Sequence, residues 1–477
     1  MTTTTEPIAT PSPANDRRTL ELDALDGLVR LSGYPHHVLS FVDADGYPVN
    51  VAVEAEIHND RRSATFTPPA DLTIPTDRPA SLTGSHIRPQ PGYGYDERRH
   101  VTVWGSVAIA PGGLVTLAAD RAWGWDESEV PFFEYSERSV GQSRRYFDAL
   151  SAERGTPVRP RLSAGWLALR TTRLPFLSAT IVPVVLGIAI AASEGSFDLL
   201  TAVLTVLGAS FVQLGLNVAN DYFDAVQGAD DMNVTPTQFS GGSRVIQYGL
   251  VSRRRMGLLA ASFYLAAAVV GLILLALRPS TALLVIGVVG IVVSLAYTAP
   301  PLKLVYRGFG EIAVAIGFGP LMLLGAYVVQ TGGTVTTQAF VASLPIALLV
   351  ALILYVNEIP DRRGDARAGK RTLPVRWPRS TVVAVYRLAA AAAYAIVVVG
   401  VAAGLLPVPA LLALLTIPLA LQVSRGLEPN YDNPYGLMAI MGVNIKVHLY
   451  AGLLLIAAYL VVLVSGAIVP SVNLFLG

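Results

Sequence analysis

The feature that most constrains the fold is a series of apolar segments that begins near Leu174 and continues almost to the end of the chain. A bilayer core of about 30 Å is crossed by roughly 20 apolar residues in a helix. The sequence therefore predicts nine membrane-spanning helices, near residues 174–193, 198–219, 256–277, 281–298, 309–330, 337–357, 381–404, 407–423 and 447–469. With 52% hydrophobic and only 14% charged residues, the chain has the composition of a polytopic protein of the lipid bilayer.

The first third of the chain has a different pattern. Val-rich alternating runs such as "HHVLSFVDADGYPVNVAV" and "RHVTVWGSVAIA" are broken by "DADG" and "APGG", which are hairpin signals. We expect a disordered tail over 1–20, a small soluble β-barrel over 21–150, a Pro- and Gly-containing linker over 151–165 and the membrane domain over 166–477. The predicted fold class is thus multidomain, a small β-barrel followed by an all-α membrane domain of nine transmembrane helices.

Charge and cysteine content exclude several classes of function. The formal net charge is +1, so no global field favours nucleic acid as a partner. The chain has no cysteine, which excludes disulfides, thiolate metal sites and cysteine nucleophiles.

The loops between the apolar segments alternate in charge. Three loops are basic, with residues such as Arg253, Arg254 and Arg255 after the second segment, whereas the opposite loops carry only Arg278. The positive-inside rule then places the basic loops and the N-terminal domain in the cytoplasm. We expect the cytoplasmic membrane of a prokaryote, with the C-terminus outside.

Acidic and amide residues gather at the basic-loop ends of two helices. In the second helix the residues fall at spacings that share one helix face, and Gly228 is expected to end that helix before Asp230. In the sixth helix the four-residue step recurs, although Pro360 is expected to kink or end the helix. The two groups are Asn217, Asn220, Asp221 and Asp224 in the second helix, and Asn357, Asp361 and Asp365 in the sixth.

Two carboxylate groups facing one cavity form a poor anion site unless hard cations lie between them. Mg²⁺ prefers oxygen ligands and is usually held by one or two carboxylates together with substrate phosphates. Basic residues that could neutralise diphosphate oxygens lie in the neighbouring loops: Arg244, Lys303, Arg307, Lys370 and Arg371. Plain topogenic anchoring is the alternative for these residues. Tyr222 and Tyr297 could stabilise a carbocation through their ring faces, or simply belong to an interfacial aromatic belt.

The stretches "NDYFDAVQGAD" and "DRRGDARAGKRT" resemble the two aspartate-rich motifs of the UbiA superfamily of intramembrane aromatic prenyltransferases. Within it, "YTAPPLKLVYRGFGEIAVAIGFGP" and "NIKVHLYAGLLL" resemble the MenA type, the 1,4-dihydroxy-2-naphthoate prenyltransferases of menaquinone synthesis. The resemblance implies Mg²⁺-dependent transfer from an allylic polyprenyl diphosphate to an aromatic acceptor, most simply dihydroxynaphthoate. It implies the metal ligands Asn220, Asp221, Asp224, Asp230, Asp361 and Asp365. The common pattern has an acid at the position of Gly228, so Asp230 ranks below Asp224 as a ligand.

Other readings stay open at this point. Lys446 and His448 could meet the carboxylate of the acceptor or assist proton removal, or they could be a snorkelling anchor and a helix cap. The acceptor could instead be a hydroxybenzoate, homogentisate, chlorophyllide or glycerol phosphate. In another class, the acids of a cation-coupled transporter would bind the ions that it moves, although such groups usually lie at the bilayer midplane.

Residues 25–150 resemble the split-barrel flavin proteins related to pyridoxamine phosphate oxidase, through "HHVLSFVDADGYPVNVAV", "RPASLTG" and "RHVTVWGSVAIAPGG". The basic residue that usually holds the flavin phosphate before the "RP" segment is missing, and Arg88, Arg98 or Arg99 would have to substitute. The resemblance allows a flavin or deazaflavin, or a regulatory barrel without a cofactor.

Overall fold

The computed structural model describes residues 21–58, 62–89, 95–159, 162–233, 236–468 and 474–475. By its internal contacts the chain divides into two compact units, Met1–Ser139 and Val140–Gly477. The tail predicted over 1–20 lies outside the described residues.

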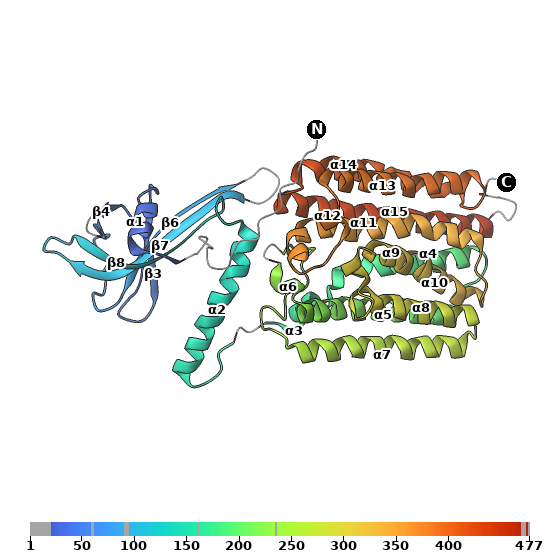
Figure 1. The fold of residues 1–477 in the computed structure, drawn as a ribbon, viewed down its shortest axis with the longest axis horizontal. Coiled ribbons are helices and arrows are strands. Elements are labelled where there is room, and N and C mark those ends of the chain that lie inside the picture. The colour runs from blue at the N-terminus through green and yellow to red at the C-terminus, as the bar shows by residue number, and fades with distance from the viewer. Residues whose placement is uncertain are drawn as a thin grey trace. The chain divides into compact units, whose positions relative to one another are not determined.

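The first unit is a curled antiparallel sheet with one short helix against it (Figure 1). Its strands follow the order β3-β2-β6-β7-β8-β5-β4, and β1 pairs with β8. The predicted hairpins are confirmed, because "DADG" joins β2 to β3 and "APGG" joins β7 to β8. The elements are β1 (Glu21–Leu22), α1 (Ala24–Leu31), β2 (His37–Val42), β3 (Pro48–Val53), β4 (Ala55–His58), β5 (Ser63–Phe66), β6 (Ala80–Pro89), β7 (Tyr95–Ile109) and β8 (Val115–Asp126).

The core of this sheet follows from the two-residue period of its strands. In the middle of β7 every second residue is buried: Val101 and Val103 are fully buried, together with Leu82 of β6 and Leu117 of β8. Helix α1 covers this face with Leu28 and Leu31. Helix α2 (Phe132–Arg154) follows the sheet and crosses the boundary between the two units.

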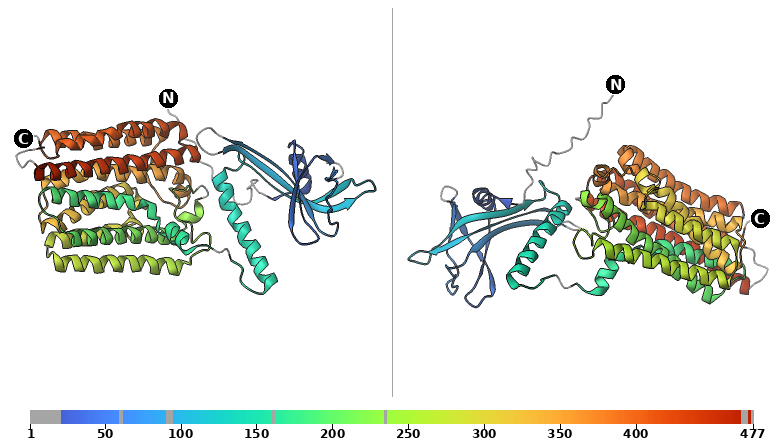
Figure 2. Two further views of the ribbon diagram at one scale, coloured as in Figure 1. Left: turned by 180° about the vertical axis from the view of Figure 1, so that it is seen from behind. Right: turned by 60° about the horizontal axis from the view of Figure 1, so that its bottom comes forward.

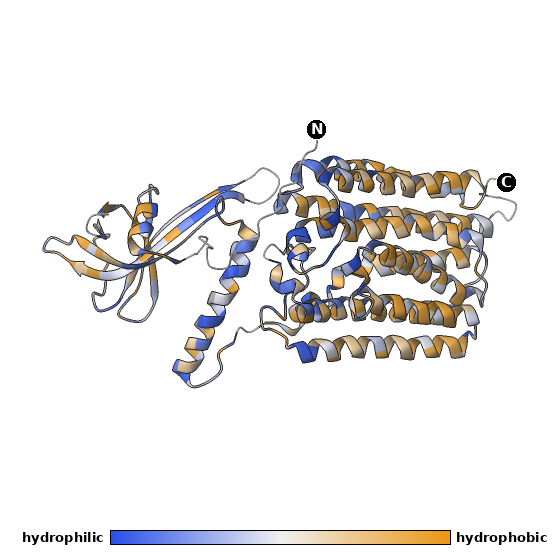
Figure 3. Cartoon of the chain, in the orientation of Figure 1, coloured by the Kyte–Doolittle hydropathy of each residue, from blue (hydrophilic) through white to orange (hydrophobic). Residues whose placement is uncertain are grey.

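The second unit is a helical bundle, and the described part of the chain contains nine helices long and apolar enough to cross a membrane, as predicted. Figures 1 and 2 show them side by side, and Figure 3 shows that their polar segments gather at the end of the bundle near α6 and α12. The spans are Leu174–Ser193 (η3, Leu174–Leu177, and α4, Ser178–Ser193), Leu199–Gln227 (α5), Arg253–Leu277 (α7), Thr281–Thr298 (α8), Gly310–Thr331 (α9, Gly310–Ile316, η5, Gly317–Leu321, and α10, Met322–Thr331), Thr337–Arg367 (α11), Arg379–Ala402 (α13), Val408–Asn430 (η6, Val408–Thr416, and α14, Ile417–Asn430) and Pro434–Gly466 (within α15, Pro434–Ile468). Helix α3 (Ala164–Thr172) precedes the first span, and short elements lie in three of the connections: α6 (Ala229–Met232), η4 (Leu304–Arg307) and α12 (Leu373–Arg376).

Three helices extend beyond their apolar segments. Helix α5 continues to Gln227, and α11 continues through Pro360 to Arg367 instead of ending there. Helix α15 begins at Pro434, well before the expected start near residue 447. Hydropathy marks only the apolar part of a helix, so polar turns at its end are not visible in it.

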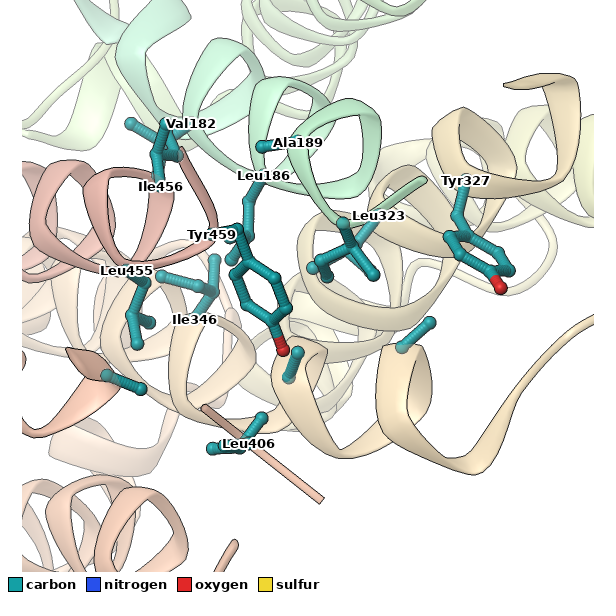
Figure 4. Close-up of a cluster of buried hydrophobic side chains, with 14 of the residues drawn as sticks. Val182, Leu186, Ala189, Leu323, Tyr327, Ile346, Leu406, Leu455, Ile456 and Tyr459 are labelled. Atoms are coloured by element: carbon teal, nitrogen blue, oxygen red, sulfur yellow. The ribbon is translucent and has the colours of Figure 1, made fainter. Parts of the chain in front are cut away.

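Small residues let the helices of the bundle approach closely. The cluster in Figure 4 packs Leu186 of α4, Leu323 of α10 and Tyr459 of α15 against one another. A methyl group on Gly187 would lie 2.3 Å from the carbonyl oxygen of Leu323, and one on Gly452 would lie 2.1 Å from Val182. In lipid, such close packing is a main source of helix association, because apolar burial alone gives little.

Candidate active site

The first acidic cluster lies on the last turns of α5, with Asp221 and Asp224 2% and 5% exposed. Asp224 accepts hydrogen bonds from the hydroxyl of Tyr306 (2.9 Å) and the amide of Asn220 (3.2 Å). Asp221 accepts one from the backbone N–H of Ser243 (3.1 Å). Tyr306 and Ser243 lie outside α5, and Asn220 lies one turn before Asp224. Hydrogen bonds from three separate places in the chain thus hold the two carboxylates in position.

Gly228 ends α5 as predicted, in the left-handed region with φ of +79°. The next turn, α6, places Asp230 beside the cluster with its side chain buried, and Arg244 donates to the backbone carbonyl of Asp230. Burial raises the pKa of Asp230 well above its ordinary value, and the nearby carboxylates of α5 raise it further. Two arginines lower that pKa without reversing the shift. Asp230 therefore keeps its proton to a higher pH than an exposed aspartate does.

The second acidic cluster lies near the end of α11. Asp361 accepts hydrogen bonds from the amide of Asn233 (2.8 Å) and from the backbone N–H of Gly241 (2.8 Å). Asn357 and Asp365 each have a buried side-chain oxygen, Oδ1 and Oδ2, without a hydrogen-bond partner in the described structure. Those two oxygens are therefore free to bind a ligand.

Lys370 joins the two clusters. Its Nζ lies 3.6 Å from a carboxylate oxygen of Asp224 and 3.6 Å from one of Asp365. Burial alone would lower the pKa of Lys370, but the nearby acidic groups, first of all Asp224 and Asp365, together outweigh burial and raise it. One ammonium group therefore tethers the ends of α5 and α11.

The loop "SGGS" before Arg244 connects the same two clusters through its backbone. Gly241 and Gly242 both have φ of +75°, which favours glycine. A methyl group on Gly242 would lie 3.2 Å from Asp221 Oδ1 and 3.1 Å from Asp230 Oδ2. Only Arg244 of this loop is predicted from the sequence to belong to the site, because residue types give no sign of the backbone donors.

Two further residues of the site, Arg173 and Tyr306, were not predicted from the sequence. Arg173, at the start of the first span, forms an ion pair with Asp221 and lies 3.4 Å from the amide oxygen of Asn220. Its backbone is left-handed, with φ of +51°, a conformation that is uncommon for a side chain of this size. The sequence signal for Arg173 was the stretch "LRTTRLP", which has two arginines directly before the apolar part of the first span.

A cavity of about 160 Å³ lies between the clusters. Most of the predicted residues line it, together with Arg173, Asn233, Glu358 and the backbone of the "SGGS" loop. The predicted residues among them are Asn217, Asn220, Asp224, Asp230, Tyr297, Asn357, Asp361, Asp365 and Lys370. Asp221 lies just behind this wall, against Gly242.

An apolar cavity of about 370 Å³ adjoins the polar one, between α5, α7, α8 and α10. Leu216, Tyr297, Val314 and Phe318 line both cavities. Along α8 the apolar cavity extends from Tyr297 to Leu283, about 21 Å at 1.5 Å per residue. A ligand with a polar head and a long hydrocarbon tail fits such a pair of cavities.

The donors that face the polar cavity suit Mg²⁺. They are carboxylate and amide oxygens, as Mg²⁺ prefers, and Asn357 Oδ1 and Asp365 Oδ2 are among those without a hydrogen-bond partner in the described structure. Among the described residues, no three His, Asp or Glu side chains already enclose a single point as a metal site. Since Mg²⁺ is usually bound by one or two carboxylates plus substrate phosphates, the residues fit ions that bind together with a diphosphate.

Other predicted residues lie outside the cavity. Lys303 lies over the ring of Tyr306 (5.6 Å), and Arg307 donates to the carbonyl of Pro301 (3.0 Å). The side chain of Arg371 is exposed.

Four more predicted residues do not line the cavity either: Arg244, which was described above, Tyr222, Lys446 and His448. The ring of Tyr222 packs between Phe223 and Gly257 of α7. Lys446 is exposed on α15. His448 is fully buried, and its ring lies beside the backbone of Ser178 in α4.

The flavin hypothesis for the sheet domain gains no support. Arg88 is paired with Asp96 (2.8 Å), and Arg98 with Glu127 (2.6 Å). Two of the three guanidinium groups that would have to meet a flavin phosphate are thus already bound to carboxylates, and Arg99 lies beside the hydroxyl group of Tyr34.

These features define a class of protein, a polytopic membrane protein with an acidic cavity that opens into an apolar one. The model of the UbiA prenyltransferase family matches residues 180–438, more than half of the chain. The chain belongs to that family and is a membrane prenyltransferase. This assignment decides against the cation-coupled transporter.

Several curated relatives are named as enzymes that act on naphthoate-type acceptors. The chain is 28% identical over 301 residues to the 1,4-dihydroxy-2-naphthoate octaprenyltransferase of Bacillus subtilis, covering 63% of this chain and 94% of the relative. It is 27% identical to the 2-carboxy-1,4-naphthoquinone phytyltransferase of Synechocystis sp. over 62% and 92%. It is 31% identical to the 1,4-dihydroxy-2-naphthoate octaprenyltransferase of Escherichia coli over 44% and 68%.

Solved structures of archaeal homologues are more distant. A UbiA homologue from Archaeoglobus fulgidus bound to GPP and Mg²⁺ is 16% identical with a TM-score of 0.45, covering 61% of this chain and 99% of its own. A homologue from Aeropyrum pernix is 19% identical with a TM-score of 0.44, covering 61% and 98%. The family assignment rests on the sequence matches.

Proposed function

We propose that this prenyltransferase moves a polyprenyl group from an allylic polyprenyl diphosphate to 1,4-dihydroxy-2-naphthoate. The proposal is carried by the shared wall of the acidic and apolar cavities, which lets one ligand place a polar head in one cavity and a hydrocarbon tail in the other. The names of the relatives support the naphthoate acceptor.

The side chains around the polar cavity suggest the division of labour. Asn220, Asp221, Asp224, Asp230, Asp361 and Asp365 would hold Mg²⁺, which when bound draws charge from the diphosphate as the bond to the allylic carbon breaks. Lys370 and Arg173 add fixed positive charge where negative charge develops on the leaving group. Tyr297 lies where the two cavities meet, so its ring face can stabilise the allylic cation. Lys303, Arg307 and Arg371, outside the cavity, would attract the diphosphate from solvent.

The test is turnover by the full chain in detergent or lipid, with geranylgeranyl diphosphate, Mg²⁺ and dihydroxynaphthoate. We expect prenylated product from the parent, and a loss of at least about 100-fold in Asp224→Asn and Asp361→Asn and with EDTA. Asp198→Asn is the matched control, because Asp198 caps the opposite end of α5 and asparagine caps equally well. If product forms only with another aromatic compound, the mechanism stands and the acceptor must be revised. If the protein does not turn over the diphosphate with any acceptor, the proposal is refuted.

We further propose that the acidic end of the bundle faces the cytoplasm, because the loops at that end carry the excess of arginine. The chain has no cysteine, so a single cysteine at exposed Arg371 would report its side of the membrane. Labelling by an impermeant maleimide in intact cells, rather than only after lysis, would contradict this orientation.

A further inference from the structure

The short helix α3 presents an apolar stripe on the outside of the bundle. Leu162, Trp166 and Leu169 recur at helical spacing, and Trp166 and Leu169 are 43% and 45% exposed. Because the first membrane span begins at Leu174, directly after α3, this helix lies close to the surface of the bilayer. An exposed tryptophan at that depth is typical of a side chain that enters the head-group region of a membrane.

The opposite side of α3 is fixed to the bundle. Leu167 packs in one cluster with Met256, near the start of α7, and Thr171 is buried. Arg170 donates to the backbone carbonyl of Ser243 (3.0 Å). The apolar stripe is therefore a fixed part of the protein surface and not the face of a loose segment.

Arginines surround the same corner of the bundle. Helix α7 begins with Arg253, Arg254 and Arg255, which are all exposed, and its first turn contains no acidic residue. Helix α2 brings Arg144 to the loop before α7, because a methyl group on Gly249 would lie 3.2 Å from Nη2 of Arg144. Figure 1 shows α3 beside the end of α7 that Figure 3 colours as hydrophilic.

The three arginines of α7 are not explained by contacts within the protein. A positive side chain in the first turn of a helix opposes the helix dipole, which favours acids there. No carboxylate of the described residues forms an ion pair with any of the three, and none of them lines the polar cavity. The positive-inside rule accounts for arginines at this end of the bundle, but it does not require an apolar stripe beside them.

The chemistry of the corner selects a lipid as its ligand. An acidic phospholipid has a phosphate group for the arginines and hydrocarbon chains for the stripe, and lipids of the adjacent leaflet surround α3. A free phosphate would contact only the arginines and would leave Trp166 and Leu169 in water. We propose that α3 and the first turn of α7 bind an acidic phospholipid, with its head group on Arg253, Arg254 and Arg255 and the upper part of its chains against Trp166 and Leu169.

The test is tryptophan fluorescence of the full chain in vesicles of phosphatidylcholine with a minor share of phosphatidylglycerol. One of the two lipids carries bromine on its chains, so that a tryptophan in contact with that lipid is quenched. The chain has five tryptophans, and the difference between the parent and Trp166→Phe isolates the signal of Trp166. Per lipid molecule, we expect brominated phosphatidylglycerol to quench Trp166 at least about fivefold more strongly than brominated phosphatidylcholine, and high salt should remove this preference.

Triple variants test which arginines act. Arg253→Gln/Arg254→Gln/Arg255→Gln should lose the preference for phosphatidylglycerol, whereas Arg253→Lys/Arg254→Lys/Arg255→Lys should keep most of it, because lysine retains the charge.

The matched control is Arg379→Gln/Arg387→Gln/Arg425→Gln. It removes the same charge from exposed arginines of α13 and α14, on the side of the bundle opposite α7 (Figure 1). Arg379 and Arg387 already have acidic partners, Asp432 and Glu428, so the control should leave the preference at Trp166 unchanged.

Several results would overturn the proposal. Equal quenching by the two lipids would show that the corner does not select an acidic head group, and no quenching by either would show that protein covers the stripe. A preference that persists in the glutamine variant of α7, or that the control also loses, would remove the assignment to these arginines. If the glutamine variant does not fold, salt decides on the parent alone, since a preference that high salt leaves unchanged does not come from the arginines.

Discussion

The ion pair between Arg173 and Asp221 offers a quantitative test of the site. The side chain of Asp221 is 3% exposed and that of Arg173 is 24% exposed. Removing one member of a buried pair costs about 3–5 kcal/mol, because the other charge stays buried without a partner. Asp221 keeps the backbone N–H of Ser243, so we expect Arg173→Gln to lower the free energy of unfolding by about 3 kcal/mol, the low end of that range.

The double variant separates the pair from its surroundings. Asp221→Asn still accepts from Ser243 but leaves Arg173 with the weaker contact to Asn220, so we expect a loss of about 2 kcal/mol. If the pair interacts, Arg173→Gln/Asp221→Asn should lose about 3 kcal/mol instead of the additive 5, a coupling of about 2 kcal/mol.

The assay is equilibrium unfolding of the metal-free protein in mixed micelles, followed by tryptophan fluorescence. Arg387→Gln is the control, since Arg387 pairs with Glu428 at a site where both side chains are more than half exposed, and we expect no measurable change. Additive losses in the double variant would refute the reasoning, because they would show that the two charges do not stabilise each other.

Three further predictions follow from the same geometry. Burial and neighbouring acids raise the folded-state pKa of Asp230, so the metal-free protein should lose stability as pH rises above the ordinary aspartate pKa. The variant Asp230→Asn should therefore have a higher Tm than the parent at pH 7 but not at pH 4, and an unchanged Tm at pH 7 would contradict this prediction. A methyl group on Gly319 would lie 2.3 Å from Cβ of Ala347, so Gly319→Val should destabilise the bundle by about 1–3 kcal/mol in the same unfolding assay, and a neutral effect would show that α11 can shift. Gly290 lines the apolar cavity beside open space, so Gly290→Phe should keep turnover of geranyl diphosphate and lose that of longer donors, and equal losses for all chain lengths in a product assay would contradict it.

The parts of the fold that follow from local rules were predictable from the sequence. The membrane spans were predictable because each needs its own run of apolar residues, and the end of α5 at Gly228 was predictable as well. The gathering of Asp224, Asp361 and Asp365 around one cavity also follows, since helix periodicity places each cluster on one face.

The other residues of the site could not be predicted, because their positions depend on which loops fold back over the cavity. Lys303, Arg307 and Lys370 look equivalent in the sequence, yet among these three only Lys370 lines the cavity. Glu358 and Arg173 went unnoticed because each lies beside a more conspicuous feature, the acidic motif and the first apolar span. Neither hydropathy nor residue spacing reports the distance between segments far apart in the chain.

The shared wall of the two cavities has a consequence for the direction of the reaction. Leu216, Tyr297, Val314 and Phe318 form the border between a compartment lined by charged groups and one lined by hydrocarbon. A transfer that occurs at this border leaves one product that dissolves in water and one that dissolves in lipid. Each product has its own exit phase, so the two seldom meet again, and dilution into different solvents makes the transfer effectively one-way.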